Sequence, residues 1–281
     1  LPFVDISGSE DGIVDLPDDI DPLFSAVADR YTHVTTPNGD VIPFLIQNMF
    51  TDEQVLHARR VLESYLTNVA GSQWGSDKDD VANAIGFTDA ILFLLNDENE
   101  YENPNVLELF NLGVKGQDLL STEVFPEGTD EYMTSSERDA TYEEILHFVH
   151  GFGIQIALPA MQASLEMAMG EAIEGNYYMP LFDLPAEDYD EEYFAMGLES
   201  YFGLWSHDPI GNGFCGDGEY PFIDRDNMEL GDQLLFSIVS GFFGERLQYS
   251  PILPSDFNSS FFLQREEGLD YTFRSQFINK I

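Results

Sequence analysis

The chain has 281 residues, of which 43% are hydrophobic and 14% aromatic, enough for a large folded core and against disorder. It carries 52 acidic residues against 11 basic ones, a formal net charge of −41. Because a surface this negative repels nucleic acid and anionic membranes, the sequence predicts neither as a partner. We attribute the charge to a solvated acidic shell suited to a saline environment, halophilic or marine, with calcium binding as the alternative interpretation.

The cysteine count and the apolar runs bear on the cellular location of the protein. Cys215 is the sole cysteine, so an intrachain disulfide is impossible and cysteine usage says little about the compartment. No apolar run reaches the roughly 20 residues of a membrane helix, which predicts a protein without membrane insertion. No signal peptide is visible, but Leu1 in place of Met indicates a trimmed chain. We therefore expect a secreted or extracytoplasmic protein.

The N-terminal part divides into an arm and the start of a domain. Residues 1–30 are acidic and rich in proline, and we expect them to form an extended arm over a single domain at 31–281. Within 31–50, the turn sequence P-N-G-D separates two runs of β-forming residues, which predicts a short hairpin.

Two helices are expected next. Thr51 and Gln54 match a capping box that opens a helix running to about Val69. His57 lies within it and is expected at the surface. Residues 79–96 are largely apolar and predict a second, buried helix.

A central helix is expected to begin at a cap formed by Thr141 or by a serine at 135–136 and to run to about His150, where Gly151 and Gly153 fit its C-terminal end. Further helices are expected at 154–172, 191–205 and 234–243. Helices thus outnumber strands, and the sequence predicts an α+β fold that is mainly helical.

The central helix carries an unusual set of polar residues. At helical spacing, Glu143, His147 and His150 fall on one face, and Glu144 adjoins them. A zinc-protease helix has the form H-E-x-x-H, with two metal ligands at i and i+4 and a general base at i+1. Here the form is E-E-x-x-H, with Glu143 at the first ligand position. The pattern is consistent with a working metalloenzyme, a rewired one or an inactive one.

This helix and the later segment Glu192-Tyr193-Phe194-Ala195 resemble a zincin-like metallopeptidase family, the gluzincins of the lethal-factor type. The family pattern is H-E-x-x-H-x-x-H-x-x-G followed by E-Y-F-A-E-G-x-x-x-Y-F. The resemblance implies a zincin-like fold, with Glu143, His147 and Glu192 as metal ligands and Glu144 as the base. The chain departs from the pattern at Glu143 and at Met196, where the family has a second Glu.

The donor set is compatible with zinc, which accepts imidazole nitrogen and carboxylate oxygen at roughly 2.0–2.2 Å. Glu143, His147 and Glu192 would bring two negative charges, which weaken the Lewis acidity of the metal and favour Mn or Fe as alternatives to Zn. Glu144 as general base needs a pKa raised by burial among its apolar neighbours. The alternative is a decayed site in which His147 is packed and hydrogen-bonded. For His150 we prefer this packed interpretation.

Three weaker patterns remain. A glycine-rich stretch follows Trp205, and we expect His207, Asp208 or Tyr220 to face a substrate. A Tyr or His donor there would stabilise an oxyanion, and an ordinary surface loop is an equal alternative. Asp224-x-Asp226-x-x-Glu229 faintly resembles a calcium loop, so calcium is a possible structural ion. The Glu-x-x-His pair of the central helix also matches di-iron bundles, which need a second copy that the sequence lacks.

Two hypotheses of function follow. The first is a metal-dependent hydrolase of peptides or other small substrates, with an atypical Glu/His/Glu site. The second is a catalytically inactive zincin-like relative that serves as a binding or surface protein. Retention of Glu144 and Glu192 favours the first, because an inactive relative has no need to keep the general base.

Overall fold

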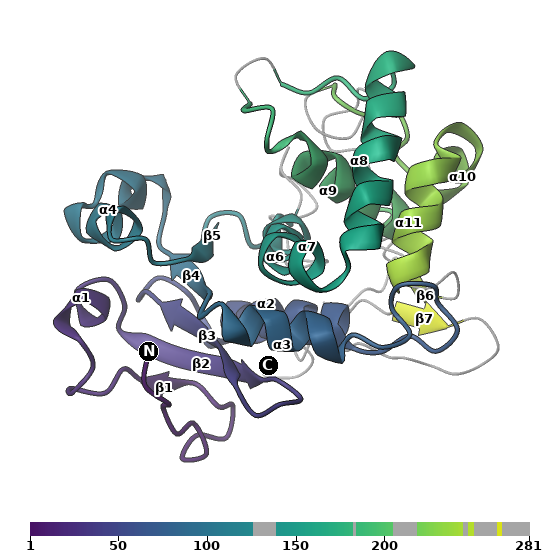
Figure 1. The fold of residues 1–281 in the computed structure, drawn as a ribbon. Helices are drawn as coiled ribbons and strands as arrows, with labels where there is room; N and C mark the ends of the chain where they lie inside the picture. Colours follow the sequence, from purple (N-terminus) through teal and green to yellow (C-terminus); the bar gives the residue numbers. More distant parts are fainter. Residues whose placement is uncertain (126–138, 182–183, 205–217, 244–246, 250–262, 266–281) are drawn as a thin grey trace, which may run out of the picture.

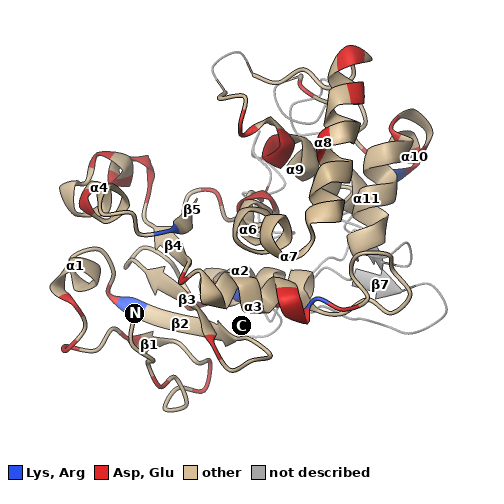
Figure 2. Cartoon of the chain, in the orientation of Figure 1, with Lys and Arg blue, Asp and Glu red and all other residues tan. Residues whose placement is uncertain are grey.

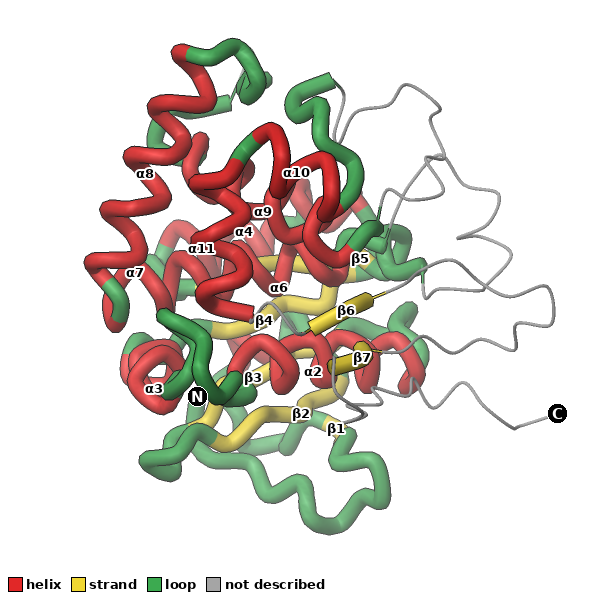
Figure 3. Tube along the Cα trace, turned by 90° about the vertical axis from the view of Figure 1, so that its right-hand side faces the viewer, coloured by secondary structure: helices red, strands yellow, loops and turns green. Residues whose placement is uncertain are grey.

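The computed structural model describes residues 1–125, 139–181, 184–204 and 218–243, together with the backbone of 247–249 and 263–265. The described chain is α+β, as predicted (Figure 1). Helices α8 to α11 gather on one side of the molecule and strands β1 to β3 on the other, which Figure 3 shows from a second direction.

One mixed sheet of five strands organises the first half of the chain. In spatial order its strands are β1 (Val14–Asp15), β2 (Arg30–Thr35), β3 (Val41–Ile46), β4 (Ile91–Leu95) and β5 (Gly116–Leu120). The pairs β1–β2 and β2–β3 are antiparallel, whereas the pairs β3–β4 and β4–β5 are parallel. Because strand order follows chain order, β5 is an edge strand of the sheet in the described chain.

The predicted hairpin is confirmed. β2 and β3 pair with Thr35 opposite Val41, and the turn between them contains Gly39 at φ +93°. Glycine adopts this left-handed backbone at no steric cost, so the P-N-G-D sequence specifies the turn.

The helices build two further layers. Their bounds are α1 Pro22–Ser25, α2 Asp52–Leu66, α3 Asp79–Phe87, a 3-10 turn Glu98–Glu102, α4 Pro104–Asn111, α6 Thr141–Val149, a π-helical turn His150–Ile154, α7 Gln155–Ala157, α8 Pro159–Glu174, α9 Tyr189–Phe202, α10 Arg225–Gly231 and α11 Gln233–Phe243. The capping box of Thr51 and Gln54 at the start of α2 is present, as predicted. A separate pair of short strands, β6 (Leu247–Tyr249) and β7 (Leu263–Arg265), lies near the C-terminus.

Successive strand residues point to opposite faces of the sheet, and other elements of the chain cover both faces. Phe44 and Leu92 belong to the larger core, which also contains residues of α2, α3, α6, α9 and α11. Leu45 and Phe93 belong to the smaller core, together with residues of α4 and of the N-terminal segment. Residues 1–29 thus contribute buried side chains to the fold, and the division at residue 30 stays a prediction.

The helix predicted over residues 79–96 is wrong in its second half. α3 ends at Phe87, Asp89 takes a left-handed backbone at φ +57°, and the chain continues as the buried strand β4. A short run of apolar residues between two buried layers has the same composition as a buried helix, so periodicity does not separate the two.

α6 ends at Val149, one residue from the predicted end, but the glycines do not stop the helical path and the predicted Thr141 cap is wrong. The alternative caps, the serines at 135–136, lie outside the described residues. The chain passes through the glycines as a π-helical turn and continues into α7. A Cβ atom on Gly153 would lie 2.8 Å from Val81 Cγ1, so this glycine permits close packing against α3. At the other end, the Thr141 side chain makes no cap; the Thr141 N–H donates to Asp139 Oδ1 at 3.1 Å.

Acidic residues are spread over the helices and loops of the described chain, and basic residues are few (Figure 2). No helix within the described ranges is both long and apolar enough to cross a membrane.

Candidate metal centre

Helix α6 carries the candidate site and is held by the core on its other sides. Its apolar residues Ile145, Leu146, Phe148 and Val149 are buried. They pack among α2, α9 and β5, which leaves the side chains of Glu143, Glu144 and His147 only partly exposed. The amphipathic pattern of the helix therefore presents its polar residues at one place beside α9.

Three predicted ligands meet at this place. Glu143 and His147 lie one turn apart on α6, and Glu192 comes from the first turn of α9. One ligand atom from each of the three lies within 4.8 Å of the other two. His147 Nε2 is 3.9 Å from Glu192 Oε1. The helix dipole favours a carboxylate at the position of Glu192, because the N-terminus of a helix is its positive end.

The donor set fits a divalent cation in chemistry and in charge. One imidazole and two carboxylates are ordinary ligands of zinc and its neighbours, and the two carboxylates match the charge of the ion. Ligand atoms about 2.1 Å from zinc lie about 3.4 Å apart at a tetrahedral angle, so the 3.9 Å separation of His147 and Glu192 must close by about 0.5 Å. A pair at the outer limit of 4.8 Å would have to close by about 1.4 Å. The group could therefore hold a metal ion.

Glu144 lies beside this group and is held by a different element. Its Oε2 accepts a hydrogen bond of 2.7 Å from Gln117 Nε2 on β5, and the same oxygen is 3.9 Å from His147 Nδ1. Burial raises the pKa of the Glu144 carboxyl well above its ordinary value, and the negative charges of Glu143 and Asp118 raise it further. A raised pKa is what a general base at this position needs, and burial is the main cause of the shift.

The two ring nitrogens of His147 face different carboxylates. Nε2 is 3.9 Å from Glu192 Oε1, and Nδ1 is 3.9 Å from Glu144 Oε2. A ligating imidazole in proteins donates its other N–H to a second group, which fixes the ring. Glu144 is placed for this orienting role as well as for that of a base, and experiment can separate the two.

A buried pair fixes the start of α6. His57 Nε2 and Asp139 Oδ2 are 2.6 Å apart, and both side chains are 1% exposed. Asp139 also accepts the N–H of Thr141, the first residue of α6. The expectation that His57 lies at the surface is therefore wrong: the side chain ties α2 to the first turn of the site helix.

His150 belongs to a separate polar network, as expected from its packed interpretation. It is buried, and its Nε2 is 2.7 Å from Gln162 Oε1. The amide of Gln162 donates in turn to Asp190 and Glu166. Burial lowers the pKa of His150, whereas burial and nearby carboxylates raise that of Glu191 to about 7.

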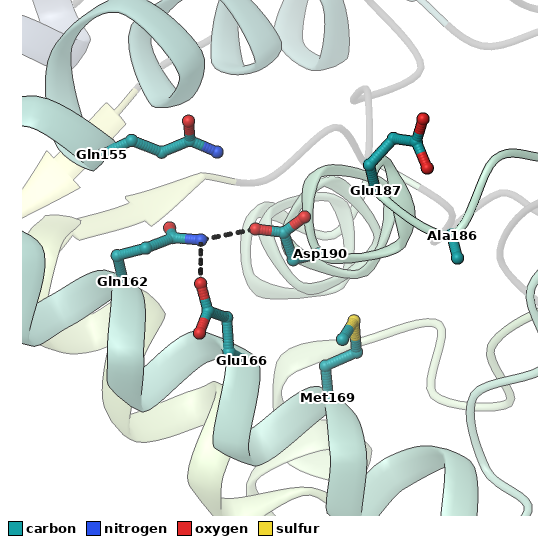
Figure 4. A pocket seen from close by; sticks show the side chains of 7 residues that line it. All are labelled: Gln155, Gln162, Glu166, Met169, Ala186, Glu187 and Asp190. Carbon is teal, nitrogen blue, oxygen red and sulfur yellow. Dashed lines mark hydrogen bonds between the residues drawn. The ribbon is translucent and has the colours of Figure 1, made fainter.

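This network borders a cavity of about 500 Å³ between α8 and the start of α9 (Figure 4). Its lining consists of Gln155, Gln162, Glu166, Met169, Ala186, Glu187 and Asp190. Three carboxylates and two amides line it beside the apolar Met169 and Ala186. No pattern in the sequence predicts this cavity, because its walls come from segments with no shared motif.

The remaining predicted residues fall elsewhere. His207 and Asp208 lie outside the described residues. Tyr220 is buried, and its hydroxyl donates to Asp232 at 3.1 Å within the core, so a catalytic role for it stays a prediction. The Asp224 carboxylate caps α10 through the N–H of Asn227 at 2.8 Å, which accounts for that residue without calcium.

Gln117 is the site residue that sequence reasoning did not find. It lies 27 positions from its partner Glu144, on a short edge strand.

Comparison of the chain with models of protein families, with curated proteins and with solved structures gives no match. The candidate site therefore depends on its own geometry.

Proposed function

We propose that this protein is a metal-dependent hydrolase whose ligands are Glu143, His147 and Glu192, with Glu144 as general base. The observation that carries the proposal is the convergence of three ligand atoms from two separate helices within 4.8 Å. Zinc as the preferred ion and a zincin-like fold are parts of the same proposal, supported by the helix spacing and the donor chemistry.

A bound divalent ion would supply Lewis acidity, which polarises a substrate carbonyl and makes a nearby water more acidic. The second carboxylate ligand reduces this effect, so we expect slow turnover. Glu144 removes a proton from the attacking water as its oxygen bonds to the carbonyl carbon. The same carboxyl then gives that proton to the leaving amine as the C–N bond breaks. Its raised pKa suits both transfers.

Peptides are the proposed substrates because an edge strand borders the site. In the register of β4 and β5, the backbone groups of Gly116 and Asp118 point away from β4. An extended peptide can pair with such an edge through main-chain hydrogen bonds. Gln117 lies between these two residues and contacts Glu144, so a peptide paired there lies next to the base.

The test is hydrolysis of a mixed peptide library by the zinc-loaded protein and by Glu144→Gln, with metal content measured in both. Loss of a base should lower kcat by about 100-fold or more while the metal is retained. A roughly 10- to 100-fold loss of metal affinity would instead assign Glu144 the orienting role.

The same experiment addresses the inactive alternative. A wild-type protein that holds a full equivalent of metal and cleaves no peptide would support a binding or surface protein that keeps the site for structure. The two carboxylate ligands are the feature that favours this second candidate, because they weaken the ion as a catalyst.

A further inference from the structure

Two adjacent glutamates compete for one ligand position. Glu143 precedes His147 by four residues and Glu144 precedes it by three, and both spacings bring side chains together on a helix. The Glu144 carboxylate lies only 3.9 Å from the His147 ring. Helical geometry alone therefore does not decide which glutamate joins the metal.

Gln117 makes the two glutamates different. Its amide donates to Glu144 Oε2 at 2.7 Å and holds that carboxylate toward β5. Glu143, Asp118 and Glu123 all repel a negative Glu144, whereas the neutral Gln117 amide donates a hydrogen bond that favours its present position.

The strand gives Gln117 a fixed position. Its backbone pairs with β4 opposite Leu92. The preceding Gly116 lies so close to β4 that an added Cβ would be 2.3 Å from Ile91 O and 2.5 Å from the Phe93 ring. Close pairing at Gly116 therefore sets how far the amide of Gln117 reaches toward α6.

We propose that Gln117 is the positioning residue that assigns the two glutamates to different roles, keeping Glu144 out of the coordination sphere so that Glu143 serves as the ligand. The inference rests on the proposed function, because it concerns the same metal centre. Without the amide, Glu144 is free to turn toward the ion and to replace or join Glu143.

The test uses Co(II) as a spectroscopic probe with the full chain, in the wild type, Gln117→Leu, Glu143→Gln and the double variant. In the wild type, Glu143→Gln should weaken Co(II) binding by 10-fold or more, because it removes a ligand. In the Gln117→Leu background the same change should cost much less, because Glu144 takes the vacant position. Gln117→Leu alone should lower the intensity of the visible Co(II) bands, as an added ligand raises the coordination number.

Tyr101→Phe supplies the matched control. The Tyr101 hydroxyl donates to Asp118 Oδ2 at 2.8 Å, so its removal deletes a bond to a carboxylate on the same strand, one residue from Gln117. The Co(II) spectrum and affinity should not change in this variant. Circular dichroism of each variant checks that the fold is retained.

The outcomes separate the two proposals. If the wild type binds neither Co(II) nor Zn(II), the metal centre and this inference both fail. If the wild type binds Co(II), but Glu143→Gln costs the same in both backgrounds and Gln117→Leu leaves the spectrum unchanged, only the role of Gln117 is overturned.

Discussion

Lys78 is a buried cation whose burial lowers the free energy of unfolding by an amount that depends on pH. It lies just before α3 with its side chain fully buried, and its ammonium donates to Tyr65 O at 2.8 Å. The Nζ atom is 4.1 Å from the centroid of the Phe242 ring. Burial lowers the pKa of Lys78 from 10.5 to about 7. The unfolded chain therefore binds a proton on this amine over a pH range in which the folded chain does not.

Stability must rise with pH across that range, from about 7 to 10.5, and be lowest below it. At about 1.4 kcal/mol per pH unit, the full pKa shift corresponds to about 5 kcal/mol. Between pH 6 and pH 9 the contribution of Lys78 changes by about 2.7 kcal/mol.

Lys78→Met keeps the length of the side chain and removes the charge. At pH 6 the variant should be more stable than the wild type by about 2 to 4 kcal/mol, because roughly 1 to 3 kcal/mol is lost by leaving the Tyr65 carbonyl without its donor. At pH 9 this advantage should shrink by about 2.7 kcal/mol.

The assay is urea unfolding at both pH values, followed by circular dichroism. Lys115→Met, at an exposed position, is the matched control for removing one positive charge from a strongly acidic chain. A difference between Lys78→Met and wild type that stays the same at pH 6 and pH 9 would refute the reasoning.

Four further predictions follow from the same contacts. Glu143→His should raise the affinity for Zn(II) in a competition titration, because imidazole is a better donor to zinc than a carboxylate; an unchanged Kd would count against Glu143 as a ligand. Gly116→Ala should lower the unfolding temperature, because its Cβ would lie 2.3 Å from a backbone oxygen of the neighbouring strand. Gly170→Ala, in open space on α8, should stabilise the fold by about 1 kcal/mol. Shifts of the same sign in the two variants would be inconsistent with this packing. His57→Leu should cost about 3 to 5 kcal/mol in urea unfolding, because it leaves the carboxylate of Asp139 buried without its partner, and a cost below about 1 kcal/mol would contradict that pairing. Raising NaCl from about 0.1 M to about 1 M should raise the melting temperature, because the added salt shortens the Debye length from about 10 Å to about 3 Å and screens repulsion within a chain of net charge −41. An unchanged melting temperature would argue against an acidic shell suited to salt.

The parts of the site on α6 were predictable because the helix encodes them locally. A four-residue spacing places Glu143 and His147 on one face, and no knowledge of the rest of the fold is needed. Glu192 was placed by resemblance to a family motif, and the structure brings it to the other two. The contacts of Gln117 and His57 could not be predicted, because their partners lie 27 and 82 positions away and no local pattern marks them.

The fold shows the same division between local and distant information. The hairpin turn and the capping box of α2 are written in adjacent residues, and both are present. The sequence predicts helix at β4 because burial on both faces removes the alternation that identifies a strand. It predicts a helix end at Gly153, whereas this glycine permits close packing of α3, a contact about 70 residues away in the chain.

The most direct test of the metal centre is the metal content of the protein purified without chelators, beside His147→Ala. We expect close to one equivalent of a transition metal by mass spectrometry in the wild type, and its loss in the variant. A wild-type protein that is metal-free and takes up no added Zn, Mn or Fe would contradict the proposed metal centre.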